Sequence, residues 1–593
     1  MLRRQKITAD LCVIGGGMAG ICAAIAAARQ GASVVLMHER PVLGGNASSE
    51  IRMWIRGAEG KNNMETGIIE EIFLENCYRN PTKNYYIWDT VLYDFVIREK
   101  NITLLLNCTC MDAVCADGDF GDGRTRKIKS VTGYQMTTQT FYDVQSTNYA
   151  DCSGDSILAP LTGAEYRLGR ESADEFTEDT PVKTPDNCVM GMSCLIQGRE
   201  TAHPITYIPP KWSTPLTNEH FKYHMPDLGS PYENFWYLEL GGDRDTIHDT
   251  EHIAKDLISL ATGTWNYIKN SGAFQAQNWD LDFLGFLPGK RESRRMVGEY
   301  IITQQDIAAN KIFEDTVAYG GWPYDVHCPD GFYNKGEVNT VAATPSPYCI
   351  PYRSMYSKNI ANLFFAGRNI SVTHMALSST RVMATCALIG QAVGTAAALA
   401  SKYTLSPHGV YQNKLHELQQ TLAENDCFLP HILRETSNLC SKTPIINGND
   451  TLKNGIDRPN SLYQDIACGV AVKNGTALAY NFSKPEMVHS LHLTFDSDLN
   501  RETLPGDYID RVCSMRSNVR MDSPQCCVPK TLCKEFEVHI TTQDGTKTIL
   551  AQNCNLNRAY SIDINEPIYS ISLTPKSNWG NTDTTTVFSF DFK

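Results

Sequence analysis

The sequence has no uninterrupted apolar run long enough to cross a bilayer. A transmembrane helix needs about 20 consecutive apolar residues, and every apolar stretch in these 593 residues is broken by a polar side chain before that length. The first ten residues include Arg3, Arg4 and Lys6, but apolar residues 11–14 lead directly into glycines, which is typical of a buried strand and not of a signal peptide. We therefore expect no membrane insertion and a cytoplasmic location, or a periplasmic one if a leader was trimmed before residue 1.

Positive charge is scarce as well. The chain has 53 Lys and Arg residues against 66 Asp and Glu residues, which gives a net charge of -13. A nucleic-acid partner needs a basic face that neutralises phosphates, and anionic membranes attract clusters of basic residues. We therefore expect no nucleic-acid partner and no adhesion to anionic membrane.

The 20 cysteines lack the regular spacing of a metal site, and the sequence contains no C-x-x-C motif. Zinc and iron–sulfur sites need several thiolates that converge at short spacing. Scattered cysteines in a large chain are typical of reduced core residues. We expect no metal site.

The first forty residues carry the pattern of a dinucleotide-binding βαβ unit. Residues 8–14 predict a strand, residues 19–30 an alanine-rich helix, and residues 33–37 a second buried strand that ends before Glu39. In the connecting Gly-x-Gly-x-x-Gly motif, the glycines permit a tight turn, close approach of a pyrophosphate and close packing of the helix, while an acid after the second strand binds ribose hydroxyls. The cofactor contacts predicted here are Gly15, Gly17, Met18, Ala19, Gly20, Glu39 and Arg40.

A second segment, far downstream, favours FAD over NAD. FAD enzymes of this type complete the sheet with a distant strand whose following helix points its N-terminus at the flavin. Residues 361–367 predict such a strand, and residues 379–402 predict a long helix of small residues. The small residues of this helix suit close packing against a cofactor, although a tightly packed helix pair explains them too. The predicted FAD contacts in this segment are Gly367, Arg368, Gly390, Gln391 and Ala392.

Five further stretches, residues 43–52, 150–155, 288–295, 318–323 and 366–371, are specific in combination. Together they resemble the FAD-dependent oxidoreductase family often grouped with the flavoprotein component of heterodisulfide reductase, related more distantly to fumarate reductase flavoproteins. The resemblance runs from about residue 8 to about residue 430. Some relatives carry iron–sulfur clusters, but this sequence lacks their cysteine runs. By position, the resemblance implies that residues near the flavin include Gly44, Gly45, Asn46, Ser48, Asp151, Gly154, Asp155 and Gly367.

The fold class expected is α/β: a glutathione-reductase-type FAD-binding Rossmann fold with an inserted α+β substrate domain and a C-terminal antiparallel β-sandwich. We predict a first FAD-binding part at residues 1–164, an insert at 165–345, a closing FAD-binding part at 346–407, a linker helix at 408–430 and the sandwich at 431–593. The sandwich is similar to the discoidin-like domains appended to carbohydrate-active proteins.

His374 is the candidate catalytic base. It lies seven residues after Gly367, in a loop expected to face the isoalloxazine ring. A histidine there could take the hydroxyl proton of an alcohol while hydride goes to flavin N5. A histidine hydrogen-bonded inside a buried loop is an equally reasonable interpretation.

Two arginines are the other catalytic candidates. Arg381, near a helix start, could bind an anionic substrate or stabilise reduced flavin, or it could lie on the surface. Arg52, in the loop after the cofactor turn, could reach the same cleft, or pair with Glu50 or Glu59.

The insert supplies candidate substrate residues. Arg294 lies in a basic cluster that could bind a carboxylate or phosphate, or hold domains together by ion pairs. Trp322 and His327 lie in an aromatic loop that suits sugar stacking or core packing.

These features predict an FAD-dependent oxidoreductase with a small-molecule substrate. Oxidation of an alcohol carbon of a sugar or glycoside is the first interpretation; the carbohydrate class rests on the aromatic insert and the appended sandwich, and is an analogy. Reduction of an activated C=C bond, as in fumarate reductase relatives, is the second, and a non-catalytic glycan-binding flavoprotein is the third. The electron acceptor and the oligomeric state are not indicated by the sequence.

Overall fold

The computed structural model describes residues 2–230, 233–505, 515 and 517–593. By its internal contacts the chain divides into two compact units. The first comprises residues 1–58, 83–415 and 512–523, and the second comprises residues 59–82, 416–511 and 524–593.

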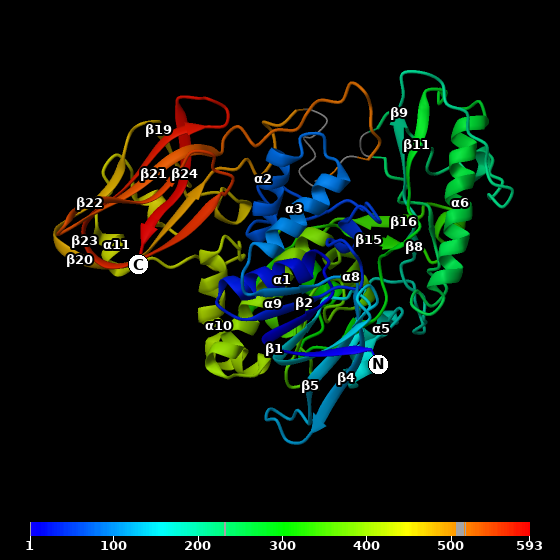
Figure 1. Cartoon of the computed structure of the whole chain (residues 1–593), viewed down its shortest axis with the longest axis horizontal. Helices are drawn as coiled ribbons and strands as arrows, with labels where there is room; N and C mark the ends of the chain where they lie inside the picture. Colours follow the sequence, from blue (N-terminus) through cyan, green and yellow to red (C-terminus); the bar gives the residue numbers. More distant parts are fainter. Residues whose placement is uncertain (1, 231–232, 506–514, 516) are drawn as a thin grey trace. The chain divides into compact units, whose positions relative to one another are not determined.

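The first unit is built on a seven-stranded sheet, seen in Figure 1. Its strands are β3 (Ile102–Leu105), β2 (Val34–Met37), β1 (Arg3–Ile14), β6 (Thr140–Asp151), β5 (Arg126–Gln135) and β4 (Cys108–Asp117) in spatial order, and β18 (Leu363–Phe365) also pairs with β6. The pairs β1–β2, β2–β3, β1–β6 and β6–β18 are parallel, whereas β4–β5 and β5–β6 are antiparallel. The downstream strand therefore joins the sheet that β1 and β2 begin, as expected for an FAD-binding fold.

Two helices pack closely beside this sheet, α1 (Met18–Arg29) and α9 (Met383–Tyr403) (Figure 1). A Cβ atom built on Gly390 would lie 2.1 Å from the carbonyl oxygen of Ala19, and one on Gly394 would lie 2.1 Å from that of Ala23. These glycines therefore let α9 approach the backbone of α1 closely. Of the two explanations given above for the small residues of this helix, the structure shows the tightly packed helix pair. Of the helices in the described residues, α9 alone is long and apolar enough to cross a membrane, and 94% of its apolar window is buried inside the protein.

The helix predicted over residues 379–402 corresponds to α9, which begins at Met383, and a separate short helix precedes it. α8 (His374–Thr380) begins after Thr373, whose side chain accepts a hydrogen bond from the amide of Ala376. The chain then turns at Val382, which is extended, with φ -66° and ψ 143°. A β-branched residue in extended conformation ends the first helix here and starts the second.

The insert combines short strands with one long helix, α6 (Thr250–Asn270). Buried side chains of α6, among them Leu257, Leu260 and Trp265, pack into an apolar core with Phe221 and Tyr237. The strands of the insert and its surroundings are β7 (Tyr166–Arg167), β8 (Met192–Ser193), β9 (Ile196–Glu200), β10 (Glu239–Leu240), β11 (Trp279–Leu284), β12 (Gly289–Lys290), β13 (Arg295–Met296), β14 (Thr316–Gly320), β15 (Tyr324–His327), β16 (Asn339–Ala342) and β17 (Tyr348–Pro351). Short helical segments of the first unit are η1 (Gly45–Ala47), α3 (Tyr85–Ile97), α4 (Leu158–Thr162), α5 (Ala173–Phe176), η2 (Asn218–Phe221), α7 (Gln304–Ala308), η3 (Gly331–Tyr333) and η4 (Tyr352–Ser354).

The second unit contains a six-stranded antiparallel sheet (Figure 1). Its spatial order is β19 (Val470–Lys473), β24 (Thr584–Phe592), β20 (Leu478–Phe495), β23 (Ala559–Asn578), β21 (Cys533–Thr542) and β22 (Gly545–Gln552). The long strands β20 and β23 are paired with register shifts, and strands bent at such bulges can contribute to both layers of a sandwich. Inward side chains such as Leu491, Phe536 and Phe590 form the core. The helical segments that complete this unit are α2 (Ile68–Arg79), α11 (Asn438–Lys442), η5 (Asp450–Lys453) and η6 (Ser461–Tyr463), and the predicted linker helix is α10 (Pro407–Glu424).

The observed unit boundaries depart from the expected ones at two segments. Residues 59–82 belong to the second unit, where buried Glu70 on α2 pairs with buried Arg501. Residues 512–523 belong to the first unit, where the side chain of Asn518 accepts a hydrogen bond from the amide of Gly198 at 2.8 Å. Each segment belongs to a different unit from its neighbours in sequence, because its polar contacts are with residues several hundred positions away along the chain.

Candidate active site

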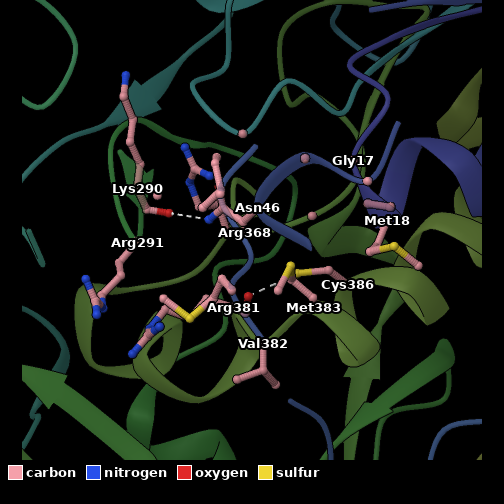
Figure 2. Close-up of a pocket in the computed structure, with 18 of the residues that line it drawn as sticks. Gly17, Met18, Asn46, Lys290, Arg291, Arg368, Arg381, Val382, Met383 and Cys386 are labelled. Atoms are coloured by element: carbon pink, nitrogen blue, oxygen red, sulfur yellow. Dashed lines mark hydrogen bonds between the residues drawn. The ribbon is translucent and has the colours of Figure 1, made fainter. Parts of the chain in front are cut away.

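A cavity of about 670 Å³ lies in the first unit. Its lining includes residues 15–19, 38–40, 44–46, 152–155, 287–291, 367–368 and 381–383, with further side chains from residues 50–56, 236, 250, 322–327 and 339–341. In Figure 2, Gly17 and Met18 lie at one side of this cavity and Lys290, Arg291 and Arg381 at the other. The volume falls within the roughly 300–1,000 Å³ of small-molecule and cofactor sites.

The glycine turn after β1 has the shape of a pyrophosphate cradle. A Cβ atom on Gly15 would lie 2.4 Å from the carbonyl oxygen of Cys152, and one on Gly20 would lie 1.8 Å from that of Gly15. A Cβ atom on Gly17, by contrast, would meet its nearest neighbour only at 3.9 Å, so the turn is open on the cavity side. The open amides at the start of α1 can therefore receive phosphate oxygens.

His38 fixes this turn to the end of β2. Its Nδ1 accepts a hydrogen bond from the amide of Gly16 at 3.0 Å, and its Nε2 lies 3.0 Å from the carbonyl oxygen of Val42. Both ring nitrogens of His38 are therefore engaged with backbone groups of the turn and of the loop that follows β2. Glu39 and Arg40, which follow, line the cavity where a ribose would be held.

Asp155 contacts several polar side chains at the end of the cavity where the flavin ring is expected. Its carboxylate lies 2.7 Å from Lys290 Nζ, 2.7 Å from Arg368 Nη2 and 2.8 Å from Ser293 Oγ. Burial alone would raise the pKa of Asp155, but the positive charges of Arg368 and Lys290 outweigh burial and lower that pKa. Asn46 donates to the carbonyl oxygen of Lys290 at 2.9 Å, a bond drawn in Figure 2.

Polar atoms without protein partners also fit a bound cofactor and substrate. Among the described residues, Arg368 Nε, Trp322 Nε1 and Arg381 Nε are buried and have no hydrogen-bond partner. All three side chains line the cavity. Buried donors of this kind are normally satisfied, so the residues present suit a ligand rich in acceptors, as FAD is.

Most predicted cofactor residues line the cavity, and six do not. Gly20 and Gly390 serve close packing, Ser48 donates to the carbonyl oxygen of Gly45, and Asp151 accepts from the amides of Ser153 and Leu158. These side chains shape the loops around the cavity. The predicted cofactor residues outside the described lining are Gly20, Ser48, Asp151, Gly390, Gln391 and Ala392.

His374 does not reach the cavity. It is buried, its backbone amide donates to Glu171 at 2.8 Å, and its Nδ1 lies 2.9 Å from a carboxylate oxygen of Glu292. It is not among the described residues that line the cavity. Its position does not support the predicted role of catalytic base, and corresponds instead to the hydrogen-bonded histidine of the alternative interpretation.

Arg52 and Arg294 are likewise absent from the described lining. Arg52 is buried, with its guanidinium 4.1 Å from the ring centroid of Phe283 and Nη1 2.9 Å from Gln197. Arg294 donates to the carbonyl oxygen of Asp155 at 3.3 Å and lies over the ring of Tyr166. Both arginines therefore hold structure beside the cavity, and neither position supports the contact with substrate or flavin that we expected.

His327, at the end of β15, does line the cavity. Its Nδ1 lies 2.5 Å from Glu239 Oε2, and its Nε2 lies 3.4 Å from Asp325 Oδ2. Arg381 pairs with Asp325 at 3.0 Å, and Arg291 pairs with Glu239 at 3.3 Å. Burial favours the neutral form of Glu239, but the positive charge of Arg291 and the hydrogen bond from His327 outweigh burial and lower the pKa of this carboxyl.

Tryptophan rings border the same centre. The ring of Trp236 meets His327 edge-on, with centroids 5.5 Å apart and planes at 80°. The guanidinium of Arg56 lies 4.7 Å from the ring centroid of Trp54 and 5.6 Å from that of Trp322. Cation–π contacts of this kind hold planar groups in place, and all five side chains line the cavity.

Glu239 was not predicted from the sequence, and Arg291 was predicted only as a member of the basic cluster that contains Arg294. Glu239 lies on β10, a strand of two residues that no periodicity reveals. Arg291 belongs to a basic cluster that the structure splits, since Lys290 and Arg291 line the cavity whereas Arg295 pairs with buried Glu171. The sequence signals for this part of the site were this cluster and the aromatic loop that contains Trp322 and His327.

Comparison with known proteins identifies the family. The FAD-dependent oxidoreductase family matches residues 10–422, which is more than half of the chain. No curated protein sequence matches. Among solved structures, a geranylgeranyl bacteriochlorophyll reductase-like protein of Thermoplasma acidophilum is 11% identical over 71% of this chain and 86% of its own, with a TM-score of 0.31.

Two other similar structures are the FrdA chain of E. coli quinol fumarate reductase and a carbohydrate-binding module. The first is 12% identical over 71% of this chain and 75% of its own, with a TM-score of 0.27. The second, the family 32 module of Streptococcus pneumoniae EndoD, is 12% identical over 26% of this chain and 99% of its own, with a TM-score of 0.18. The family match, together with the glycine cradle and the parallel sheet, shows that this chain belongs to the FAD-dependent oxidoreductase family and is a flavoenzyme.

Proposed function

We propose that this flavoenzyme oxidises an alcohol carbon of a sugar or glycoside. The observation that carries the proposal is the position of His327, which lines the cavity between two carboxylates and beside tryptophan rings. A histidine so placed can remove a hydroxyl proton, and the rings offer flat apolar surfaces to a sugar.

His327 acts as the general base. Its Nε2 takes the hydroxyl proton, and Glu239, 2.5 Å from Nδ1, stabilises the imidazolium that results. Arg291 keeps Glu239 ionised by its own positive charge. FAD, when bound, would supply the hydride acceptor that oxidation of an alcohol to a carbonyl compound requires.

The cavity also offers groups that would orient a polyol. Asp325 and Asn339 line it, and Arg381 Nε and Trp322 Nε1 are buried donors without partners among the described residues. A hydroxyl group both donates and accepts, so donors and acceptors on facing walls suit a ring that carries several hydroxyls.

Charge pairing distinguishes this function from reduction of an enoate. An anionic substrate needs cations that are not neutralised, yet Arg381 lies 3.0 Å from Asp325 and Arg291 lies 3.3 Å from Glu239. Each of these two arginines is therefore paired with a carboxylate. A neutral polyol meets no unpaired charge of this kind, which favours oxidation of an alcohol.

Anaerobic spectroscopy tests the proposal. Oxidised holoenzyme should lose its flavin absorbance when mixed with a sugar alcohol or glycoside from a panel, and His327→Gln should bleach on the order of 100- to 10,000-fold more slowly, the range for loss of a general base. His248→Gln is the matched control, because His248 pairs with Asp245 at an exposed position. Reoxidation of reduced enzyme by an enoate, with no bleaching by any sugar, would replace this function by enoate reduction.

A further inference from the structure

A second cavity, of about 300 Å³, lies in the insert. Its lining comes from the segment around η2 and from the segment around η3, with Tyr237 between them. None of its lining residues lines the larger cavity. It is therefore distinct from the site that holds FAD and substrate.

Tyr237 presents a buried donor to this cavity. The side chain is 2% exposed, and among the described residues its Oη has no hydrogen-bond partner. Buried tyrosine hydroxyls usually find a partner. Burial raises the pKa of Tyr237 well above its ordinary value, so the hydroxyl keeps its proton and can donate it in a hydrogen bond.

The outer part of the cavity is positively charged. Lys222 and Lys335 line it and are exposed, and Glu219 is the one acidic residue in the described lining. Glu337, which is outside the described lining, pairs with the lining residue His224 at 3.3 Å. This balance favours an anion over a cation or a neutral sugar.

Aromatic rings form much of the wall. The ring of His224 stacks on Tyr237, with centroids 5.0 Å apart and planes at 12°. Phe332 and Tyr223 also line the cavity, and Lys222 Nζ lies 5.6 Å from the ring centroid of Tyr223. Flat surfaces of this kind favour a planar ligand.

We propose that this cavity binds a small aromatic carboxylate that carries a polar substituent opposite its carboxylate. The carboxylate lies toward Lys222 and Lys335, and the substituent accepts the hydrogen bond of Tyr237 Oη. The ligand is recognised at both ends, by charge at the exposed end and by a hydroxyl at the buried end.

Trp236 connects the two cavities. Its ring lines the larger cavity and meets His224 edge-on at 5.2 Å and His327 edge-on at 5.5 Å. Because His224 lines the second cavity, a ligand there is separated from the proposed base by two packed rings, those of His224 and Trp236. This contact makes the second cavity suited to an effector.

Titration calorimetry of the holoenzyme with three probes tests this inference. 4-Hydroxybenzoate should bind saturably, and benzoate and 4-hydroxybenzyl alcohol should bind several-fold more weakly, because each lacks one of the two recognised groups. Tyr237→Phe should weaken 4-hydroxybenzoate binding by roughly three- to tenfold, the range for one hydrogen bond, and leave benzoate binding unchanged.

The lysines test the charged end. Lys335→Gln and Lys222→Gln should each weaken 4-hydroxybenzoate binding by roughly two- to fivefold and reduce its sensitivity to salt. Lys255→Gln, on the exposed face of α6, is the control that should change neither. Absence of saturable binding to the wild-type holoenzyme, or binding that Tyr237→Phe and both lysine variants leave intact, would overturn the inference.

Discussion

Replacement of Glu239 by glutamine tests the electrostatic core of the proposed mechanism. Glu239 is fully buried, and its Oε2 lies 2.5 Å from Nδ1 of His327. Glutamine keeps the shape of the side chain but removes the charge that stabilises an imidazolium. Unit charges about 4 Å apart interact by about 4 kcal/mol at an effective dielectric constant of about 20.

The variant keeps part of this electrostatic stabilisation of the imidazolium, because Asp325 still faces the other nitrogen of His327. A loss of about 3 kcal/mol in the transition state corresponds to a rate on the order of 100-fold lower. The assay is stopped-flow bleaching of the flavin under saturating substrate without oxygen. The affinity for FAD should stay unchanged.

A matched control exists in the same unit. Glu292 is also fully buried, and it pairs with His374 and with Arg295, but none of the three is in the described lining of the cavity. Glu292→Gln should therefore cost stability comparable to that lost in Glu239→Gln, about 3–5 kcal/mol, with little change in bleaching rate. If Glu239→Gln bleaches at the wild-type rate, or if both variants slow equally, the reasoning is refuted.

Three further predictions concern packing, cofactor retention and pH. Gly390→Ala should lower the free energy of unfolding by about 1–3 kcal/mol, because its Cβ atom would lie 2.1 Å from a backbone oxygen of α1; urea unfolding should show no comparable loss for Gly118→Ala, where the nearest atom lies at 3.6 Å. Asp155→Asn should release FAD roughly tenfold more readily in a flavin fluorescence assay, because Lys290 and Arg368 lose the carboxylate that positions them; unchanged retention would argue against that role. Burial raises the pKa of Glu233 to about 7, so the folded state binds this proton more tightly than the unfolded chain, and stability should fall as pH rises from the ordinary glutamate pKa toward 7 and stay low above it. Glu233→Gln should therefore stabilise the protein at pH 8 by up to about 3 kcal/mol and have little effect at pH 4; an equal effect at both values would contradict this.

Local patterns were sufficient to predict the cofactor fold. The glycine turn, the helix after it and the strand that ends before Glu39 are specified by residues close in sequence, and all three are observed. The distant strand β18 was recognisable because an apolar run followed by Gly367 is itself a local signal. These elements needed no knowledge of long-range contacts.

The choice of histidine could not be made in this way. His374 begins α8, and its amide is held by Glu171, more than two hundred residues earlier in the chain, which keeps the ring inside the protein. His327 reaches the cavity because Glu239, on a strand of two residues, orients its ring. Spacing along the chain does not encode pairings of this kind, so the sequence analysis assigned the base to His374 and assigned His327 only to an aromatic loop of the insert.

The second unit shows the same limit. Its alternating strands were predicted from period-two patterns, and the antiparallel sheet confirms them. The assignment of α2 to that unit depends on the buried pair of Glu70 and Arg501, which are 431 positions apart. No local pattern in residues 59–82 distinguishes them from the cofactor loop that precedes them.

The most direct test of the account is anaerobic mixing of the oxidised holoenzyme with sugars and glycosides, followed at the flavin absorbance for wild type and for His327→Gln. The account predicts that at least one sugar or glycoside bleaches the wild-type flavin, and that His327→Gln retains FAD but bleaches on the order of 100-fold or more slowly. No bleaching by any member of the panel, or bleaching of His327→Gln at the wild-type rate, would contradict it.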